Sequence, residues 1–432
     1  MSDMNPNPIQ KRLVYKIEAV LASPALIGSG ESESTDSDVL LNASGNPYLP
    51  GSALAGVLRH TLDEKDADLL FGSLASEKMS ALWVMDSKFT KNKDVILTRD
   101  DIMELDGVAL DPENKTALAK RKYDFQAVPG DARFTIRLML VLREKDQNGA
   151  AMEALTERLL SQLRCGGISV GAKAGRGFGR VKCTAIQRQV FDYRTHDRTA
   201  LDRWIQFEWD TDTGWEPYTP ARTGASDATM TAVLKLCGSI MIRDTGSLDG
   251  DEDFKHISCG GEPVIYGTSW AGAFRGGLHK LLKPLSGQEA LQGKQVDKYL
   301  DEFFGFVREE NALAEDDGRR QSASRLRFDM SVLEKEAGRE AEQGYRTITR
   351  VKINRFTGGA ADGALFTERP WAGGKTTLVV RYPAGDTECE KLIRIALDAM
   401  HRGILTIGGE TAIGRGVFQV VSEQYAKGGD AA

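Results

Sequence analysis

The sequence predicts two tandem α+β modules of the ferredoxin-like class, and three observations lead to this prediction. Segments of the first half recur in the second half in the same order. Each half is predicted to run strand, helix, strand, helix, strand with long insertions, unlike the regular alternation of a parallel sheet. The chain has 432 residues, 41% hydrophobic and 27% charged, which is long enough for two domains that each bury a core.

The duplication rests on three pairs of segments that are separated by 216, 243 and 237 positions. These separations differ only by insertions of loop length. Three matches in one order, spread over most of both halves, are hard to reach by chance. The pairs are 51–59 with 267–275, 108–111 with 351–354, and 171–179 with 408–416.

The repeat divides the chain into a first module (residues 1–190), a linker (191–228) and a second module (229–432). The linker has no counterpart inside a module. It holds three tryptophans and ends in a stretch rich in Thr, Pro, Gly and Ser, which is typical of a connection between domains.

Each module is expected to contain the same elements in the same order. An alternating strand and an acidic loop lead to a helix, with Ser52 or Thr268 at the N-cap position. A basic middle section, a strand, a helix, a Gly-rich hairpin and a last strand follow. The expected strands are 13–21, 134–142 and 180–185 with 231–242, 376–382 and 416–421, and the expected helices are 52–62 and 152–163 with 268–282 and 388–400.

Composition argues against several classes of protein. The chain has no run of about eighteen apolar residues and its first residues do not form a signal peptide, so we expect no membrane contact. Five single cysteines favour neither disulfides nor a zinc site and fit a cytoplasmic protein. A net charge of −6 argues against polyanion binding by the whole surface, although basic residues cluster locally.

The Gly-rich hairpins are candidate anion sites. Glycines let backbone N–H groups approach a phosphate closely, and basic side chains add charge. Lys173 and Arg176 supply that charge in the first module and Arg415 in the second. The alternative is a tight hairpin without a ligand, because a glycine motif by itself is weakly specific.

The first helix of each module and the basic middle section hold the other binding candidates. A helix start can bind a phosphate, with N-capping and a solvated salt bridge as alternatives. Cations with an aromatic ring suit single-stranded RNA, with an exposed charged loop as the alternative. The residues are Gly51, Ser52, Arg59, Lys120, Arg121 and Lys122 in the first module, and Thr268, Ser269, Arg275, Lys352, Arg355 and Phe356 in the second.

Several of these motifs resemble a known family. Pro-Gly-Ser-x-Leu-x-Gly-x-x-Arg at 50–59 is similar to the helix-opening motif of the RAMP superfamily of CRISPR proteins, and GAKAGRGFGRV at 171–181 is similar to its Gly-rich loop. The stretch 351–370 resembles the thumb hairpin of backbone subunits in type III effector complexes. The resemblance covers nearly the whole chain, twice. It implies two modified RRM-like domains with thumb insertions, as in fused backbone subunits of divergent, type III-D-like systems.

The resemblance also implies partners. Backbone subunits line a filament with other CRISPR effector subunits, hold a guide RNA and insert the thumb into the duplex of guide and target RNA. With this in view, RNA contact is favoured over a ligand-free hairpin at the Gly-rich loops.

The resemblance further implies a loop aspartate that cuts target RNA. It starts an Asp-Ser-x-hydrophobic stretch, which places it at Asp36, with Asp38 as the alternative. Cleavage needs the ribose 2′-oxygen to attack the adjacent phosphorus in line. A carboxylate can hold a divalent cation, Mg²⁺ or Mn²⁺, near the phosphate or help to deprotonate the hydroxyl, and Asp36 is the expected metal ligand. The histidines are dispersed, and His256, the one in an acidic loop, is expected to be exposed.

The second copy departs from this pattern. The separation of 216 positions sets Glu252 opposite Asp36 and Phe254 opposite Asp38. Asp253 is therefore the first candidate and Asp251 the second. A solvated acidic loop in an inert half is the alternative.

Three functions remain to be compared. The leading hypothesis is a guide-RNA-binding backbone subunit that acts as a metal-dependent endoribonuclease within the assembled complex. The runner-up is a non-catalytic RNA-binding scaffold of the same kind. A nucleotide-dependent enzyme is disfavoured, because a helix should follow its Gly-rich loop and neither loop here is followed by one.

Overall fold

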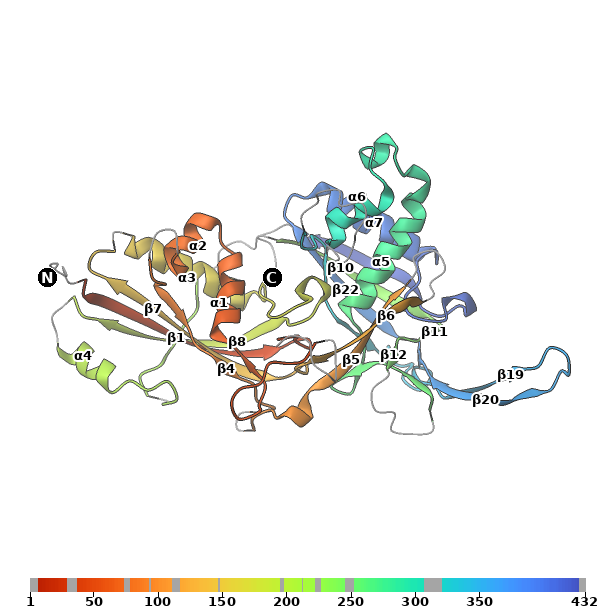
Figure 1. Ribbon diagram of the computed structural model, residues 1–432, viewed down its shortest axis with the longest axis horizontal. Coiled ribbons are helices and arrows are strands. Elements are labelled where there is room, and N and C mark those ends of the chain that lie inside the picture. Colours follow the sequence, from red (N-terminus) through yellow and green to blue (C-terminus); the bar gives the residue numbers. More distant parts are fainter. Residues whose placement is uncertain are drawn as a thin grey trace.

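A computed structural model gives the arrangement of the chain (Figure 1). Two modules lie along the long axis of the molecule, each a sheet with helices against one face. The strands β19 (Ile348–Ile353) and β20 (Ala360–Arg369) form a hairpin that extends away from the second module. The structure describes residues 7–28, 37–73, 78–92, 95–110, 117–146, 148–194, 198–211, 213–221, 227–244, 252–306 and 321–426.

The first module is built on an antiparallel sheet with the strand order β3-β7-β1-β8-β9, in which β9 is Glu216–Pro217. Its β-α-β-β-α-β order and the arrangement of its four main strands fit the ferredoxin-like fold. The elements are β1 (Ile9–Leu21), β2 (Tyr48–Leu49), α1 (Gly51–His60), α2 (Glu64–Phe71), β3 (Leu82–Val84), β4 (Ser87–Lys88), β5 (Met103–Leu110), β6 (Ala117–Ala127), β7 (Arg133–Arg143), α3 (Gly149–Arg164) and β8 (Val181–Asp192).

The second module repeats this plan, with the order β17-β22-β10-β23 at the centre of its sheet. Its helices lie on the same side of the molecule as those of the first module (Figure 1). The elements are β10 (Asp227–Cys237), β11 (Ser239–Ile240), β12 (Arg243–Asp244), β13 (Phe254–His256), β14 (Ser258–Cys259), β15 (Glu262–Ile265), α5 (Gly267–Leu282), α6 (Val296–Phe304), β16 (Arg327–Phe328), β17 (Ser331–Glu334), β18 (Gly344–Tyr345), β21 (Trp371–Ala372), β22 (Lys375–Pro383), α7 (Thr387–His401) and β23 (Val417–Ala426).

Each module has its own core between the sheet and the helices. Alternate residues of the central strand face that core, Tyr15 and Ile17 in β1 and Ala232 and Leu234 in β10. Both central strands carry a β-bulge at the same place, between Glu18 and Ala19 and between Val233 and Leu234. The alternating pattern thus fixes which face of each strand is buried.

The predicted thumb segments are two-stranded hairpins of matching register. In the first, Val108 pairs with Lys122 and Leu110 with Ala117; in the second, Val351 pairs with Leu365 and Ile353 with Ala360. The irregularity falls at the same step of both hairpins. This match confirms the separation of 243 positions between the two copies.

The Gly-rich segments also share one backbone conformation. Positive φ angles occur at Gly171, Lys173, Gly177 and Gly179 and recur at the four residues 237 positions later, Gly408, Glu410, Gly414 and Gly416. A Cβ at Gly179 would collide with the carbonyl oxygen of Val170, and one at Gly416 with that of Ile407. Each loop contains a single turn of 3₁₀ helix, η2 (Ala174–Arg176) or η5 (Thr411–Ile413).

The start of the first helix differs from the prediction. The N-caps of α1 and α5 are Pro50 and Tyr266, and neither caps through its side chain. Ser52 and Thr268 lie inside the first turn, because each helix begins one residue earlier than expected, at Gly51 or Gly267. The assignment of both hydroxyls as N-caps was therefore wrong.

The linker region contains α4 (Arg198–Ile205) and β9 (Glu216–Pro217), which pairs with β8. Trp204, Phe207, Trp209 and Trp215 pack on the sheet face of the first module opposite its helices, around Phe191. β8 continues to Asp192 and β10 begins at Asp227, so the strands extend beyond the predicted boundaries on both sides. Within the described residues, no helix is long and apolar enough to span a membrane.

Candidate nucleic-acid interface

The two acidic loops are closed by β-pairs at equivalent positions. Gly28 pairs with Val39 in the first module, and Asp244 pairs with Lys255 in the second, both 216 positions later. This register supports the alignment of Glu252 with Asp36. Asp36 itself and Asp251 lie outside the described residues.

The loop of the first module ends against the β5–β6 hairpin. The N–H of Gln126, near the end of β6, donates to the carbonyl oxygen of Ser37 at 2.9 Å, and the Gln126 Oε1 accepts from the N–H of Val39 at 3.2 Å. Asp38 lies between these two contacts and is half-buried. Its position beside the hairpin is thus held by backbone hydrogen bonds.

The loop of the second module makes the same kind of contact with β20. The N–H of Asp253 donates to the carbonyl oxygen of Thr367 at 2.8 Å, and its Oδ2 accepts from the N–H of Thr367 at 2.7 Å. The Asp253 side chain is exposed. Glu252, opposite Asp36, forms an ion pair with Arg369 at 3.0 Å. In this half the aspartate is accessible while the residue aligned with Asp36 is engaged.

The described residues of these loops could supply only some of the ligands of a divalent cation. Among the residues that the structure describes, no group of three or more His, Cys, Asp or Glu side chains could hold a metal ion. Mg²⁺ commonly uses one or two carboxylates and takes its other ligands from water and substrate phosphates. Asp253 offers one such oxygen besides the one that Thr367 occupies.

The first Gly-rich loop has two basic side chains, Lys173 and Arg176, that form no ion pair with another described residue. The Lys173 Nζ lies 3.5 Å from the ring centroid of Phe125 and 4.3 Å from that of Tyr123, both on β6. Burial, together with the charge of Arg176, lowers the pKa of Lys173 to about 8. Arg176 is exposed. The pair forms a positive spot at the base of the β5–β6 hairpin that an anion could neutralise.

This loop also forms the junction between the modules. A Cβ at Gly267, the first residue of α5, would collide with the carbonyl oxygens of Arg176 and Phe328, so glycine permits the approach. Phe178 stacks on Tyr266 with ring centroids 5.6 Å apart, and Arg180 faces Asp329 at 3.5 Å. The helix start of the second module is therefore covered by the Gly-rich loop of the first.

The second Gly-rich loop corrects the prediction for Arg415. Its side chain is 4% exposed and pairs with Glu368, which is fully buried, and with Glu410 at 2.8 Å. Arg350 joins the same cluster, 2.9 Å from Glu368. Because its charge is already matched inside the protein, Arg415 is not presented to a phosphate. In the first module the aligned residues Phe178 and Phe125 form an aromatic pair, and Lys173 lies over the ring of Phe125.

The predicted residues of the first helices are mostly engaged within the protein. The Gly51 N–H donates to Asp86 at 2.7 Å, and Ser52 is exposed while Thr268 and Ser269 are half-buried. Arg59 pairs with Asp68 and donates to the carbonyl oxygen of Gly72 at 2.8 Å. These contacts favour the structural alternative for the arginines.

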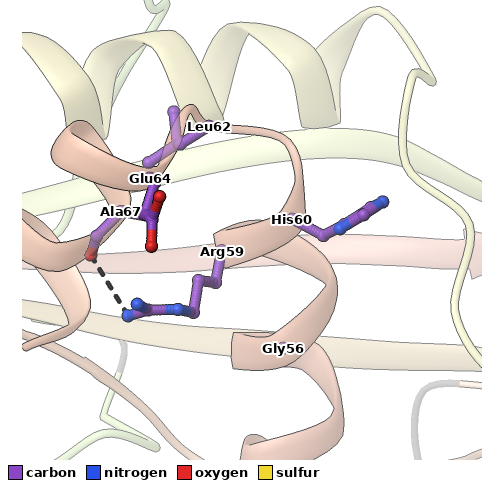
Figure 2. A pocket seen from close by; sticks show the side chains of 6 residues that line it. All are labelled: Gly56, Arg59, His60, Leu62, Glu64 and Ala67. Carbon is purple, nitrogen blue, oxygen red and sulfur yellow. Dashed lines mark hydrogen bonds between the residues drawn. The ribbon is translucent and has the colours of Figure 1, made fainter. Parts of the chain in front are cut away.

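Figure 2 shows the Arg59 guanidinium turned toward the carbonyl oxygen of Ala67, across an open hollow of about 410 Å³ between α1 and α2. Arg275 repeats this arrangement with Asp301 at 2.8 Å. Sequence reasoning missed the partners, although Asp-Leu-Leu-Phe-Gly at 68–72 recurs as Asp-Glu-Phe-Phe-Gly at 301–305. That repeat is the signal that could have found these salt bridges.

The β19–β20 hairpin presents the predicted cations of the second module to solvent. Lys352 and Arg355 are exposed near its tip, and Phe356 is 100% exposed. Asn354 holds the turn, because its side-chain oxygen accepts from the N–H of Phe356 at 2.9 Å. Lys120, Arg121 and Lys122 lie on β6 of the other hairpin, and their side chains are outside the described part.

His256 is a second correction. It is fully buried, its Nδ1 accepts from the N–H of Ile242 at 3.1 Å, and its Nε2 lies 3.1 Å from the carbonyl oxygen of Val264. Burial lowers the pKa of His256 to about 4. The residue is a neutral structural link between strands and not an exposed loop histidine.

Comparison with protein families gives the class of the chain. The model of the RAMP superfamily matches residues 18–182 and 219–419. These two regions cover most of the sequence, so the chain belongs to the RAMP superfamily and carries its signature twice. A search of the curated proteins finds no match.

Two similar solved structures are both of the Type III-B Cmr-beta. A chain of the form bound to cognate target RNA is 19% identical with a TM-score of 0.32, and the match covers 41% of this chain and 61% of that one. A chain of the apo state is 12% identical with a TM-score of 0.32, covering 40% of this chain and 96% of that one. The match thus spans less than two thirds of the first of these chains.

Proposed function

We propose that the chain is a guide-RNA-binding backbone subunit of a type III CRISPR effector complex that cleaves complementary target RNA through loop aspartates. One observation carries the proposal. In both modules an acidic loop is hydrogen-bonded to the base of a long hairpin, through Ser37 and Gln126 or through Asp253 and Thr367. A strand of RNA kinked by the hairpin meets a carboxylate there.

Membership of the RAMP superfamily supports the setting of this proposal. The proposed partners are guide RNA, complementary target RNA and other effector subunits in a filament, in the cytoplasm. The proposed RNA contacts are the hairpins with Lys120, Arg121, Lys122, Lys352 and Arg355 and the first Gly-rich loop with Lys173 and Arg176. Ser52, Thr268 and Ser269 are the proposed contacts at the helix starts.

The proposed chemistry is attack of a ribose 2′-oxygen on the adjacent phosphorus, in line with the leaving 5′-oxygen. Asp36 and Asp253 are the proposed catalytic residues, with Asp38 and Asp251 as alternatives. Each carboxylate accepts the proton of the attacking hydroxyl or supplies one oxygen to a divalent cation, which would stabilise the charge on the phosphate. The hairpin residues hold the backbone in the geometry that in-line attack needs.

The alternative is a non-catalytic scaffold, and one observation favours it for the second module. Glu252 is paired with Arg369, and one oxygen of Asp253 already accepts a backbone hydrogen bond. Both contacts hold the loop in place without RNA.

The test is cleavage of labelled target RNA by the assembled complex with guide RNA and Mg²⁺ or Mn²⁺. We expect Asp36→Ala and Asp253→Ala each to remove one set of cuts and the double variant to remove both. Asp398→Ala, on the exposed face of α7, is the matched control. Cleavage at every position by the double variant would overturn the catalytic assignment, and a wild-type complex that binds but never cuts would establish the scaffold.

A further inference from the structure

The sheet faces opposite the helices carry cations at one corner of each module, three of them exposed and one, Lys235, half-buried. They are Arg133 and Lys182 in the first module and Lys235 and Lys375 in the second, here called the outer-face cations. We propose that they bind the phosphates of single-stranded RNA without regard to its sequence. The inference rests on the proposed function and adds a surface to it that lies outside the hairpins and Gly-rich loops.

The register of the first sheet brings its two cations together. Val20 of β1 lies opposite Arg133 of β7 on one side and Lys182 of β8 on the other. Directly opposed residues share a face, and two strand spacings put the cations about 9–10 Å apart. Their chain neighbours Phe134 and Val181 belong to the core, so the cations point to the opposite face.

The second sheet reaches the same result with different residues. Lys235 of β10, aligned with Val20 through the shared bulge, lies directly opposite Lys375 of β22. Like charges at directly opposed positions destabilise a sheet. Lys375 is the first residue of β22, as Arg133 is the first residue of β7. Both copies thus place two cations at this corner, although only the position of Arg133 and Lys375 is shared.

Acidic partners do not account for these cations. Within the described residues none of the four forms an ion pair, whereas Arg137 and Arg381 on the same strands pair with Asp210 and Asp329. Glu18 is the acid on the face of the first patch. Its counterpart in the second module is Val233, and the acid of that patch is Glu334 of β17, directly opposite Lys375, so each corner holds two cations and one acid. The corner therefore has an excess of positive charge that an anionic ligand would relieve.

The position of the corner identifies the ligand. β7 is the next strand after the β5–β6 hairpin, β22 follows the β19–β20 hairpin after the short strand β21, and β8 begins directly after the first Gly-rich loop. RNA that passes the base of a hairpin therefore meets these cations next. Thr135 and Thr377 lie beside them, and their hydroxyls can donate to phosphate or ribose oxygens. Contacts of this kind do not distinguish one base sequence from another.

The experiment measures the affinity of the full chain for a labelled 20-nucleotide single-stranded RNA between 50 and 200 mM KCl. For single strands log K falls as log salt rises, and each lost phosphate contact lowers the steepness of this slope by about 0.7. Arg133→Ala with Lys182→Ala, and Lys235→Ala with Lys375→Ala, should each lower it by about 1.4, equally for poly(U) and poly(A). Arg133→Lys with Lys182→Arg should keep the wild-type slope.

The matched control is Lys65→Ala with Lys280→Ala, two exposed cations on the helices, which should leave the slope unchanged. An unchanged slope in both outer-face variants, beside a lowered slope in Lys352→Ala with Arg355→Ala, would overturn this inference and leave the proposed function intact. If the wild-type chain binds no RNA, the proposed function fails and this inference with it.

Discussion

The buried cluster around Arg415 gives a prediction whose size follows from the structure. Replacing Arg415 by Met removes the guanidinium that bonds Glu368 and Glu410, and Glu368 is fully buried. Removing one partner of a buried ion pair costs about 3–5 kcal/mol, because the other charge stays desolvated. Arg350 remains 2.9 Å from Glu368 and compensates in part, so we expect about 3 kcal/mol.

The assay is urea unfolding of the second module, followed by hydrogen exchange of the β10 and β22 amides because the two modules need not unfold together. With a slope of about 2 kcal/mol/M, the expected loss lowers the midpoint by about 1.5 M. Arg402→Met, which breaks an exposed pair with Asp398, should change it by less than about 0.5 M. A loss below about 1 kcal/mol for Arg415→Met would refute the reasoning.

Other predictions concern single groups. Lys173, with its pKa of about 8, loses its charge as the pH rises from 7 to 9, so the RNA affinity of the wild-type chain should fall over that range. The affinity of Lys173→Arg should stay constant, because arginine keeps its charge. Anisotropy titrations at both pH values measure this, and a parallel fall in Lys173→Arg would contradict it. Arg275→Ala should cost about 1–3 kcal/mol of stability, because it removes a partner of the buried Asp301. It should leave RNA affinity unchanged, and a weaker RNA complex at equal folding would disprove this. His256 has its pKa lowered to about 4, so the folded state binds fewer protons than the unfolded state between pH 6.5 and 4. The stability of the second module should therefore decrease as the pH is lowered from 6.5 to 4. An equally steep decrease of the urea midpoint in His256→Gln would argue against this.

The sequence predicted what local patterns encode. Alternating apolar residues located the central strands, and the glycines at 171–179 and 408–416 located two loops of one conformation. The short elements β3, β4, β16 and β17 and the helices α2 and α6 were missed. Strands of two to four residues carry too little periodicity to be recognised.

Contacts between distant residues limited the prediction of the site. Arg415 looks like a free loop cation in the sequence, and only folding shows that Glu368, 47 positions away, neutralises it. His256 lies among acidic residues in the sequence but faces Val264 in a buried strand. The pairing of Arg59 with Asp68 likewise depends on how α2 folds back on α1.

The claim that the chain consists of two RNA-holding modules is tested most directly by nuclease footprinting of guide RNA on the full chain. Two protected stretches of similar length are predicted, one for each module. Replacing the exposed tip of the second hairpin, residues 352–358, with a short Gly-Ser turn should remove one stretch and leave the other. A single protected stretch in the wild-type chain, or loss of both on this change, would contradict the account.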